Sequence, residues 1–143
     1  MSATADAAEE QRQPGSRLGI QSGQVVQELG FDEDCDIQLR RSIEVLAGAA
    51  LVDGDYDDVV DVVLLWWRDG DGDLVDALVD ALTSLAAGGV IWLLTPKAGR
   101  RGHVEPSDIE EAAPTAGLSA TRSTAAAPEW SGTRLVAPKM GRR

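Results

Sequence analysis

The stretch VVDVVLLWW at residues 59–67 decides the fold class. Its leading residues are β-branched, and the apolar residues continue without the polar alternation of a half-exposed strand. Such a run is typical of a strand that is covered on both faces, as in a parallel sheet. A second run of the same kind, VIWLL at residues 90–94, follows a Gly-Gly pair. The two runs predict neighbouring buried strands of an α/β domain.

Leucines at helical spacing connect these two strands. Leu74, Leu78 and Leu82 recur every four residues, which predicts a helix over residues 73–86 with Asp73 as its cap. The same reasoning predicts a strand at 24–29, a helix at 36–47, a short helix from Ser107, and two further strands at 118–125 and 133–136. This order predicts a Rossmann-like, mostly parallel sheet with helices on both faces and a C-terminal antiparallel hairpin.

The chain of 143 residues has the length of one domain. Polar and small residues dominate the start, so residues 1–16 are predicted to be a disordered leader. A single domain then spans residues 17–139, and residues 140–143 form a basic tail.

Charge and hydropathy exclude several classes of protein. Twenty-four acidic residues face thirteen Lys and Arg, for a net charge of −11, and residues 1–94 alone carry −14. Such a chain repels phosphate backbones, so we expect no nucleic-acid binding.

The longest apolar run, residues 62–67, is far shorter than the ~20 residues that span a bilayer. No apolar signal segment occurs in residues 1–17, and we predict a cytoplasmic protein without membrane contact.

Metal and catalytic sites are not predicted. One cysteine, Cys35, and one histidine, His103, cannot build a Cys/His zinc site. The aspartates at 69, 71 and 73 have the spacing of a calcium loop, but Leu74 stands where that loop needs glycine. No nucleophile has an obvious base beside it, so no catalytic residue is assigned.

Ligands of open α/β sheets bind beyond the carboxyl ends of the strands. Residues 30–34, 66–73 and 95–103 should meet at that edge. The side chains of Trp66 and Trp67 should point to opposite faces of the sheet. Two readings are open: one of the tryptophans stacks on a ligand, or both cover the sheet under helices. The predicted ligand cleft consists of Glu28, Gly30, Asp32, Trp66, Trp67, Arg68, Asp69 and Asp71.

A second candidate surface is the basic loop that follows the strand at 90–94. Its glycines and cations can hold a phosphate or an acidic partner, or the loop is simply solvated. Trp130, near the predicted hairpin tip, is expected to be exposed and to contact a partner. The predicted partner or anion loop comprises Lys97, Arg100, Arg101 and His103, together with Trp130.

Long runs of residues resemble one family. GQVVQELG at 23–30, LLWWRDGDGDLVD at 64–76, WLLTPK at 92–97 and GHVEPS at 102–107 look like the actinobacterial domain of unknown function 3052 family. The resemblance implies an actinobacterial cytoplasmic protein and no particular activity.

A second, architectural resemblance is to class I methyltransferases that use S-adenosylmethionine, over residues 56–136. Residues 26–30 also look like the start of the first methyltransferase motif, which continues Gly-x-Gly-x-Gly so that the backbone approaches the cofactor. Only Gly30 is present, and Asp32 and Asp34 occupy the next two glycine positions. Too few residues separate Gly30 from Tyr56 for the usual second and third strand units, which implies a truncated sheet.

These observations predict a non-enzymatic binding or regulatory module with a degenerate cofactor pocket and no bound cofactor. A protein partner is expected, and the sheet edge that truncation exposes can pair two copies into a homodimer. The alternative is a methyltransferase-like enzyme that binds S-adenosylmethionine or a nucleotide in the predicted cleft.

Overall fold

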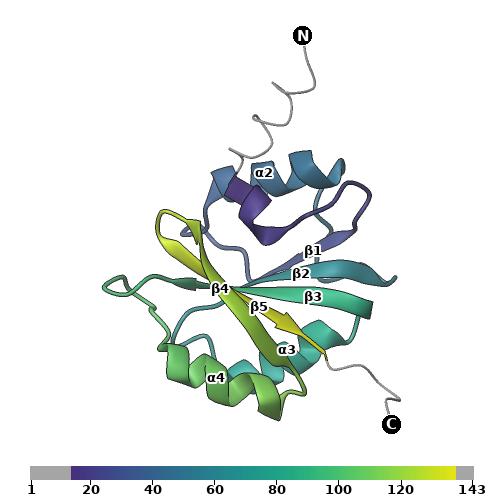
Figure 1. Ribbon diagram of the computed structural model, residues 1–143. Helices are drawn as coiled ribbons and strands as arrows, with labels where there is room; N and C mark the ends of the chain where they lie inside the picture. The colour runs from purple at the N-terminus through teal and green to yellow at the C-terminus, as the bar shows by residue number, and fades with distance from the viewer. Residues whose placement is uncertain (1–13, 138–143) are drawn as a thin grey trace.

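The computed structural model describes residues 14–137, and these form a three-layered α/β domain (Figure 1). In chain order the elements are η1 (Pro14–Leu18), β1 (Val26–Leu29), α2 (Ile37–Ala47), β2 (Val60–Trp66), α3 (Leu74–Leu82), β3 (Leu85–Pro96), α4 (Pro106–Thr115), β4 (Ser119–Ala127) and β5 (Trp130–Val136). The predicted alternation of strands and helices is confirmed, and so is the final pair of strands.

One mixed sheet of five strands has the order β1-β2-β3-β5-β4. The first three strands are parallel, with Leu64 opposite both Glu28 and Trp92. The hairpin β4–β5 adds to β3 in antiparallel fashion, with Arg134 opposite Trp92. The parallel strands and the antiparallel C-terminal hairpin are therefore as predicted.

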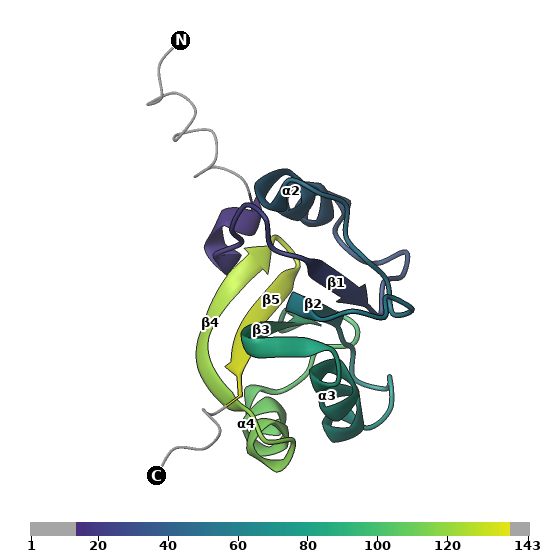
Figure 2. The same ribbon diagram turned by 90° about the vertical axis from the view of Figure 1, so that its right-hand side faces the viewer.

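Helices cover both faces of this sheet. The elements η1 and α2 lie on one face, and α3 and α4 lie on the other (Figures 1 and 2). Each face has its own apolar core, one around Trp66 and Trp92 and the other around Val63 and Ile91. The uninterrupted apolar sequence of β2 follows from this double cover, because alternate side chains enter different cores.

The helix predicted over residues 73–86 is shorter than expected. Asp73 caps it as predicted by accepting from the amide of Asp76, but α3 ends at Leu82. Leu85 instead begins β3 and pairs with Val60. Leu85, which was predicted to lie in the helix, is instead held in the sheet by its pairing with the distant residue Val60. The helix predicted from Ser107 begins at Pro106, and its N-cap residue Glu105 provides no side-chain hydrogen bond.

The sheet is truncated beyond β1 within the described residues. Only a single bridge, between Gln27 and Val52, extends it there. The Glu28 amide donates to the Val52 carbonyl at 2.8 Å, and the Val52 amide donates to Val26 at 2.9 Å. The edge that was predicted to pair two copies is therefore partly covered by the chain itself.

The predicted leader of residues 1–16 falls mainly outside the described residues, as does the tail of residues 140–143. Residues 14–16 belong to the ordered helix η1, and the amide of Gly15 donates to Ser42 of α2 at 2.8 Å. The domain therefore begins before residue 17. None of the helices within residues 14–137 is both long and apolar enough to cross a membrane.

Candidate functional site

A cavity of about 490 Å³ lies at the carboxyl ends of the parallel strands, where the topology predicts a ligand. It receives residues from the turn after β1, the loop after β2, the loop after β3 and the β4–β5 turn. Its lining is mostly charged and of both signs: Asp32, Asp34, Arg68, Asp69, Pro96, Arg100, Arg101, Gly102, Glu129 and Trp130. We call this space the carboxyl-end cavity.

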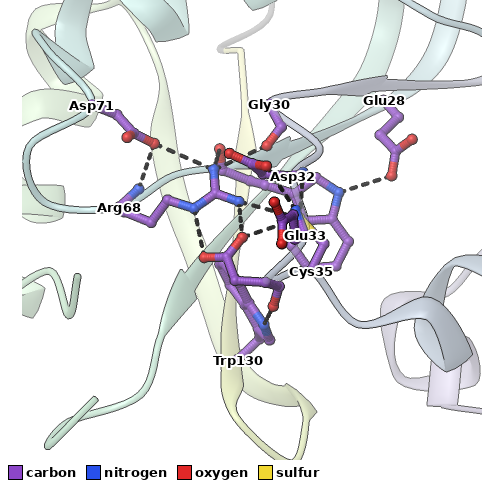
Figure 3. Close-up of polar contacts among 10 residues, drawn as sticks. Glu28, Gly30, Asp32, Glu33, Cys35, Arg68, Asp71 and Trp130 are labelled. Atoms are coloured by element: carbon purple, nitrogen blue, oxygen red, sulfur yellow. Dashed lines mark hydrogen bonds and ion pairs between the residues drawn. The ribbon is translucent and has the colours of Figure 1, made fainter. Parts of the chain in front are cut away.

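Arg68 organises one wall of the carboxyl-end cavity (Figure 3). Its Nε and Nη2 donate to the two carboxylate oxygens of Asp34, at 2.9 and 2.5 Å. Its Nη1 donates to the carbonyl of Gly30 at 2.9 Å and to Asp71 at 3.3 Å. The side chain is only 14% exposed. Arg68 thus joins the turn after β1 to the loop after β2, and a bidentate pair of this kind fixes geometry as well as charge.

The same contacts shift two ionisation equilibria. Hydrogen bonding from Arg68 holds the pKa of the Asp34 carboxyl below its ordinary value. Burial raises the pKa of the neighbouring Cys35 thiol to about 11. The Cys35 sulfur accepts from the Asp32 amide and from Arg68 Nη2, both at 3.2 Å. Cys35 is therefore a protonated, packed thiol near neutral pH.

Glu28 was predicted to line the ligand cleft, and this is wrong. Its two oxygens accept from Arg40 Nε and Nη2, each at 2.7 Å, and the Glu28 side chain is 7% exposed. One of these oxygens also accepts from Trp66 Nε1 at 2.9 Å. Glu28 therefore joins β1 to α2 and β2, and its hydrogen-bonding capacity faces the protein.

Gly30 has a left-handed backbone with a φ of 80°. A Cβ atom at this position would lie 2.4 Å from the carbonyl oxygen of Trp66. Glycine is needed because the turn after β1 approaches the backbone of β2. Close approach of a cofactor is not required to explain it. The Gly30 carbonyl is occupied by Arg68 and does not line the carboxyl-end cavity.

The two adjacent tryptophans lie on opposite faces, as predicted. Trp66 is fully buried with η1 and α2, and Trp67 packs against the α3 and α4 core. Neither lines the carboxyl-end cavity. Of the two alternatives for these residues, the structure favours cover of the sheet, and their assignment to a ligand cleft is wrong.

The predicted basic loop divides between two hollows. Arg100 and Arg101 line the carboxyl-end cavity, and Arg100 pairs with Glu129 at 2.5 Å. His103 lies elsewhere, in a hollow of about 190 Å³ beside α4, with Nδ1 2.9 Å from the Pro96 carbonyl. Lys97 lines neither hollow. The loop and the cleft, predicted as separate surfaces, therefore meet in one cavity through the two arginines.

Trp130 was predicted to be an exposed partner contact, and this is wrong. It is 4% exposed and packs edge-on against Trp66, with ring centroids 4.8 Å apart. Its Nε1 donates to the Asp34 carbonyl at 3.2 Å, and Arg68 lies 5.4 Å from its ring centroid. Trp130, at the start of β5, therefore packs against Trp66 of β2 and is one of the lining residues of the carboxyl-end cavity.

Three predicted cleft residues, Asp32, Arg68 and Asp69, do line the carboxyl-end cavity. A fourth, Asp71, does not line the cavity but accepts hydrogen bonds from the amide and Nη1 of Arg68. Two lining residues, Asp34 and Glu129, were not among the predicted site residues. Asp34 alternates with Asp32 in the turn after β1, which was a usable signal. Glu129 had no usable sequence signal, because only the hairpin geometry brings it to Arg100.

Within residues 14–137 no group of three or more potential ligands could hold a metal ion.

Comparison with known sequences identifies relatives of unknown activity. The family described as "Protein of unknown function (DUF3052)" matches residues 15–139. Uncharacterised proteins of Mycobacterium bovis and Mycobacterium tuberculosis are 58% identical over 123 residues. The alignment covers 86% of this chain and 77% of each relative.

Several solved structures share the fold. The pyocyanin biosynthetic protein PhzM superimposes with a TM-score of 0.63 at 16% identity, covering 92% of this chain but only 56% of PhzM. A S-adenosylmethionine-dependent methyltransferase from Thiobacillus denitrificans, solved with S-adenosylhomocysteine, gives 0.55 at 13% identity, covering 91% of both chains. The CcbJ methyltransferase of Streptomyces caelestis gives 0.58 at 10% identity, covering 92% and 90%. Identities this low establish a methyltransferase-like fold and nothing about activity.

Proposed function

The chain belongs to the DUF3052 family of proteins of unknown function, and from its site we propose that it is a non-catalytic binding or regulatory module. The observation that carries this proposal is the position of Arg68. Its guanidinium donates hydrogen bonds to the Gly30 carbonyl and to the Asp34 carboxylate, and so lies between the ends of β1 and β2. A cofactor that approached the turn after β1 would have to displace this well-bonded side chain.

Two further observations support the same proposal. The acidic residue of β1, Glu28, already accepts three hydrogen bonds, from Arg40 and Trp66. A Cβ atom at Gly30 would point at the backbone of β2, so this glycine is explained by packing within the protein. The protein's own groups thus occupy the features that resemble the first methyltransferase motif. The remaining space lies further along the sheet edge, between Arg68 and the loop after β3.

The ligand that this space favours is a small molecule with both charges, such as a free amino acid. Asp32 and Asp69 line the carboxyl-end cavity and form no ion pair with any described residue. The same holds for Arg101. Carboxylates can receive an ammonium group, and a guanidinium can receive a carboxylate or phosphate. A cavity of this volume falls within the usual range for small-molecule sites.

A thermal-shift screen tests the proposal. Free amino acids, nucleotides, S-adenosylmethionine and S-adenosylhomocysteine are each added to the purified protein. A ligand at about 100 times its Kd stabilises by about 2.7 kcal/mol, which moves the Tm by several degrees. We expect a zwitterion to give this shift in the wild type and in Arg41→Gln, and to lose it in Arg101→Gln and Asp69→Asn. A panel without a stabilising zwitterion contradicts the ligand assignment.

The second candidate function is a methyltransferase-like enzyme. It is favoured by the fold and by a cavity at the edge of the sheet where such folds bind ligands. This alternative expects S-adenosylhomocysteine to stabilise the protein, and the shift to be lost in Asp69→Asn. That result would replace the module proposal and direct the search to a methyl acceptor.

A protein partner also remains a proposal. Arg100 and Arg101 are exposed at the rim of the carboxyl-end cavity, where an acidic segment can reach them. Pairing of two copies has less support at β1, because Val52 covers part of that edge. Light scattering after size exclusion tests the dimer, and charge reversal at Arg100 and Arg101 tests the loop.

A further inference from the structure

A second large hollow, of about 550 Å³, lies at the opposite end of the parallel strands. It forms on the face covered by η1, where Gly88 and Val90 near the start of β3 meet the β4–β5 hairpin. Its lining contains no acidic residue, although the protein carries twenty-four. The lining residues are Leu18, Gly19, Gln24, Val62, Gly88, Val90, Trp92, Thr121, Arg122 and Arg134. We call this space the amino-end hollow.

Two arginines stand directly opposite each other in the amino-end hollow. Arg122 of β4 is the register partner of Arg134 of β5, so both side chains leave the sheet on the same face. Like charges in this position destabilise a sheet. Neither arginine forms an ion pair with an acidic residue within residues 14–137. The fold therefore keeps two adjacent positive charges without a counter-charge in this part of the chain.

Neutral groups hold both guanidinium groups in place. Arg122 lies 5.6 Å from the ring centroid of Trp92 and donates through Nη2 to the carbonyl of Arg17 at 2.5 Å. Arg134 donates through Nη1 to the Thr121 hydroxyl at 3.0 Å. A guanidinium has five N–H donors, and each of these hydrogen bonds uses one of them. Most donors of both arginines remain for a ligand.

The floor of the amino-end hollow is also fixed. Trp92 is 1% exposed, and its Nε1 donates to the Leu18 carbonyl at 2.9 Å. Trp92, Arg134 and Arg122 form one cross-strand row over β3, β5 and β4. A rigid aromatic base below two positioned guanidinium groups provides a preformed site rather than a loose surface patch.

We propose that the amino-end hollow binds the phosphate group of a small organic phosphate, with Arg122 and Arg134 as its ligands. Planar guanidinium groups bind phosphate oxygens in a bidentate manner. One phosphate also supplies the counter-charge that the cross-strand pair lacks. A polyanion such as RNA is disfavoured, because the net charge of −11 repels a long phosphate backbone. This site is separate from the carboxyl-end cavity, and its existence does not depend on the function proposed there.

The test measures the Tm of the full chain in inorganic phosphate and in glycerol 3-phosphate, each against sodium chloride of equal ionic strength. We expect both phosphates to raise the Tm by several degrees over chloride. Arg122→Gln and Arg134→Gln should each lose most of that difference. Arg41→Gln, which removes an exposed arginine of α2 that lines neither cavity, should retain it.

The variants also report on their own folding. Removal of either arginine relieves the like-charge contact, so in low salt without phosphate the Tm should not fall by more than a degree or two. If one variant fails to fold, Arg122→Lys, which keeps the charge and loses the bidentate geometry, should show a weakened phosphate shift. The proposal is overturned if phosphate and chloride give equal Tm values in the wild type. It is equally overturned if Arg41→Gln abolishes the shift, or if Arg122→Gln and Arg134→Gln both keep it.

Discussion

The guanidinium of Arg68 meets the carboxylate of Asp34 through two nitrogens at once, Nε to Oδ2 at 2.9 Å and Nη2 to Oδ1 at 2.5 Å. The two residues are 34 positions apart and follow different strands of the sheet. Their pairing closes the crevice between the ends of β1 and β2. Asp34 and Arg68 both line the carboxyl-end cavity and give this part of its wall one acidic and one basic group.

Replacement of Arg68 should destabilise the domain. Arg68→Gln removes the paired contact with Asp34 and the hydrogen bond to the Gly30 carbonyl. Hydrogen bonds to charged groups contribute about 1.5–3 kcal/mol each, and Asp34 is half exposed, so we expect a net loss of about 2 kcal/mol. Urea denaturation measures it. Arg41→Gln, an exposed arginine of α2, should change stability by less than about 0.5 kcal/mol. Equal effects of the two substitutions would contradict the role of Arg68.

The Asp34 pair should contribute to acid stability. Because the Asp34 pKa is lower in the folded protein than its ordinary value of 3.8, the contribution is fully present above that value. It is lost as the pH falls through the lower, folded value. The difference in unfolding free energy between wild type and Asp34→Asn should stay constant from pH 7 to about pH 5 and shrink below about pH 4. A difference that grows toward low pH would contradict the assignment.

Cys35 should be an inert thiol in the folded protein. Its pKa is raised from 9.0 to about 11, so the thiol reacts with Ellman's reagent at pH 8 only after unfolding. The folded state holds this proton more tightly than the unfolded state does. Stability should therefore fall as the pH rises from 9 to 11. The fall should be smaller in Cys35→Ser, which isolates this group from other alkaline titrations. Rapid labelling of the folded protein at pH 8 would argue against this placement.

Trp130 should matter for stability rather than for partner contact. It is 4% exposed and packs on Trp66 at 4.8 Å between ring centroids. Trp130→Ala should cost about 3–5 kcal/mol, the usual range for a buried aromatic residue. Val59→Ala, at a position 60% exposed, is the control and should cost less than about 0.5 kcal/mol. Thermal or urea unfolding distinguishes the two. If Trp130→Ala costs as little stability as the Val59→Ala control, the conclusion that Trp130 is a buried, stabilising residue is contradicted.

Much of the fold could be predicted because its decisive signals are local. The apolar runs at 59–67 and 90–94 and the Asp73 cap locate two strands and one helix from neighbouring residues alone. The limit of α3 could not be predicted, because Leu85 joins a ladder with Val60 across the sheet. Local helix propensity loses to tertiary pairing at this position.

The site was predictable only in its location. Strand topology brings the turns after β1, β2 and β3 to one edge, so Asp32, Arg68 and Asp69 meet Arg100 and Arg101 there. Which side chains pair is decided by packing. Glu28 turns to Arg40, and the hairpin folds Trp130 over Trp66. No spacing in the sequence encodes these nonlocal contacts.

Isothermal titration calorimetry of the wild-type protein with S-adenosylhomocysteine tests the central claim most directly. Because Arg68 and the Gly30 carbonyl close the crevice between β1 and β2, we expect no binding heat at ligand concentrations up to about 1 mM, which corresponds to less than about 4 kcal/mol of binding free energy. A micromolar Kd that is lost in Asp69→Asn would contradict the account. It would show that the closed crevice opens for a cofactor and that this chain is a methyltransferase-like enzyme.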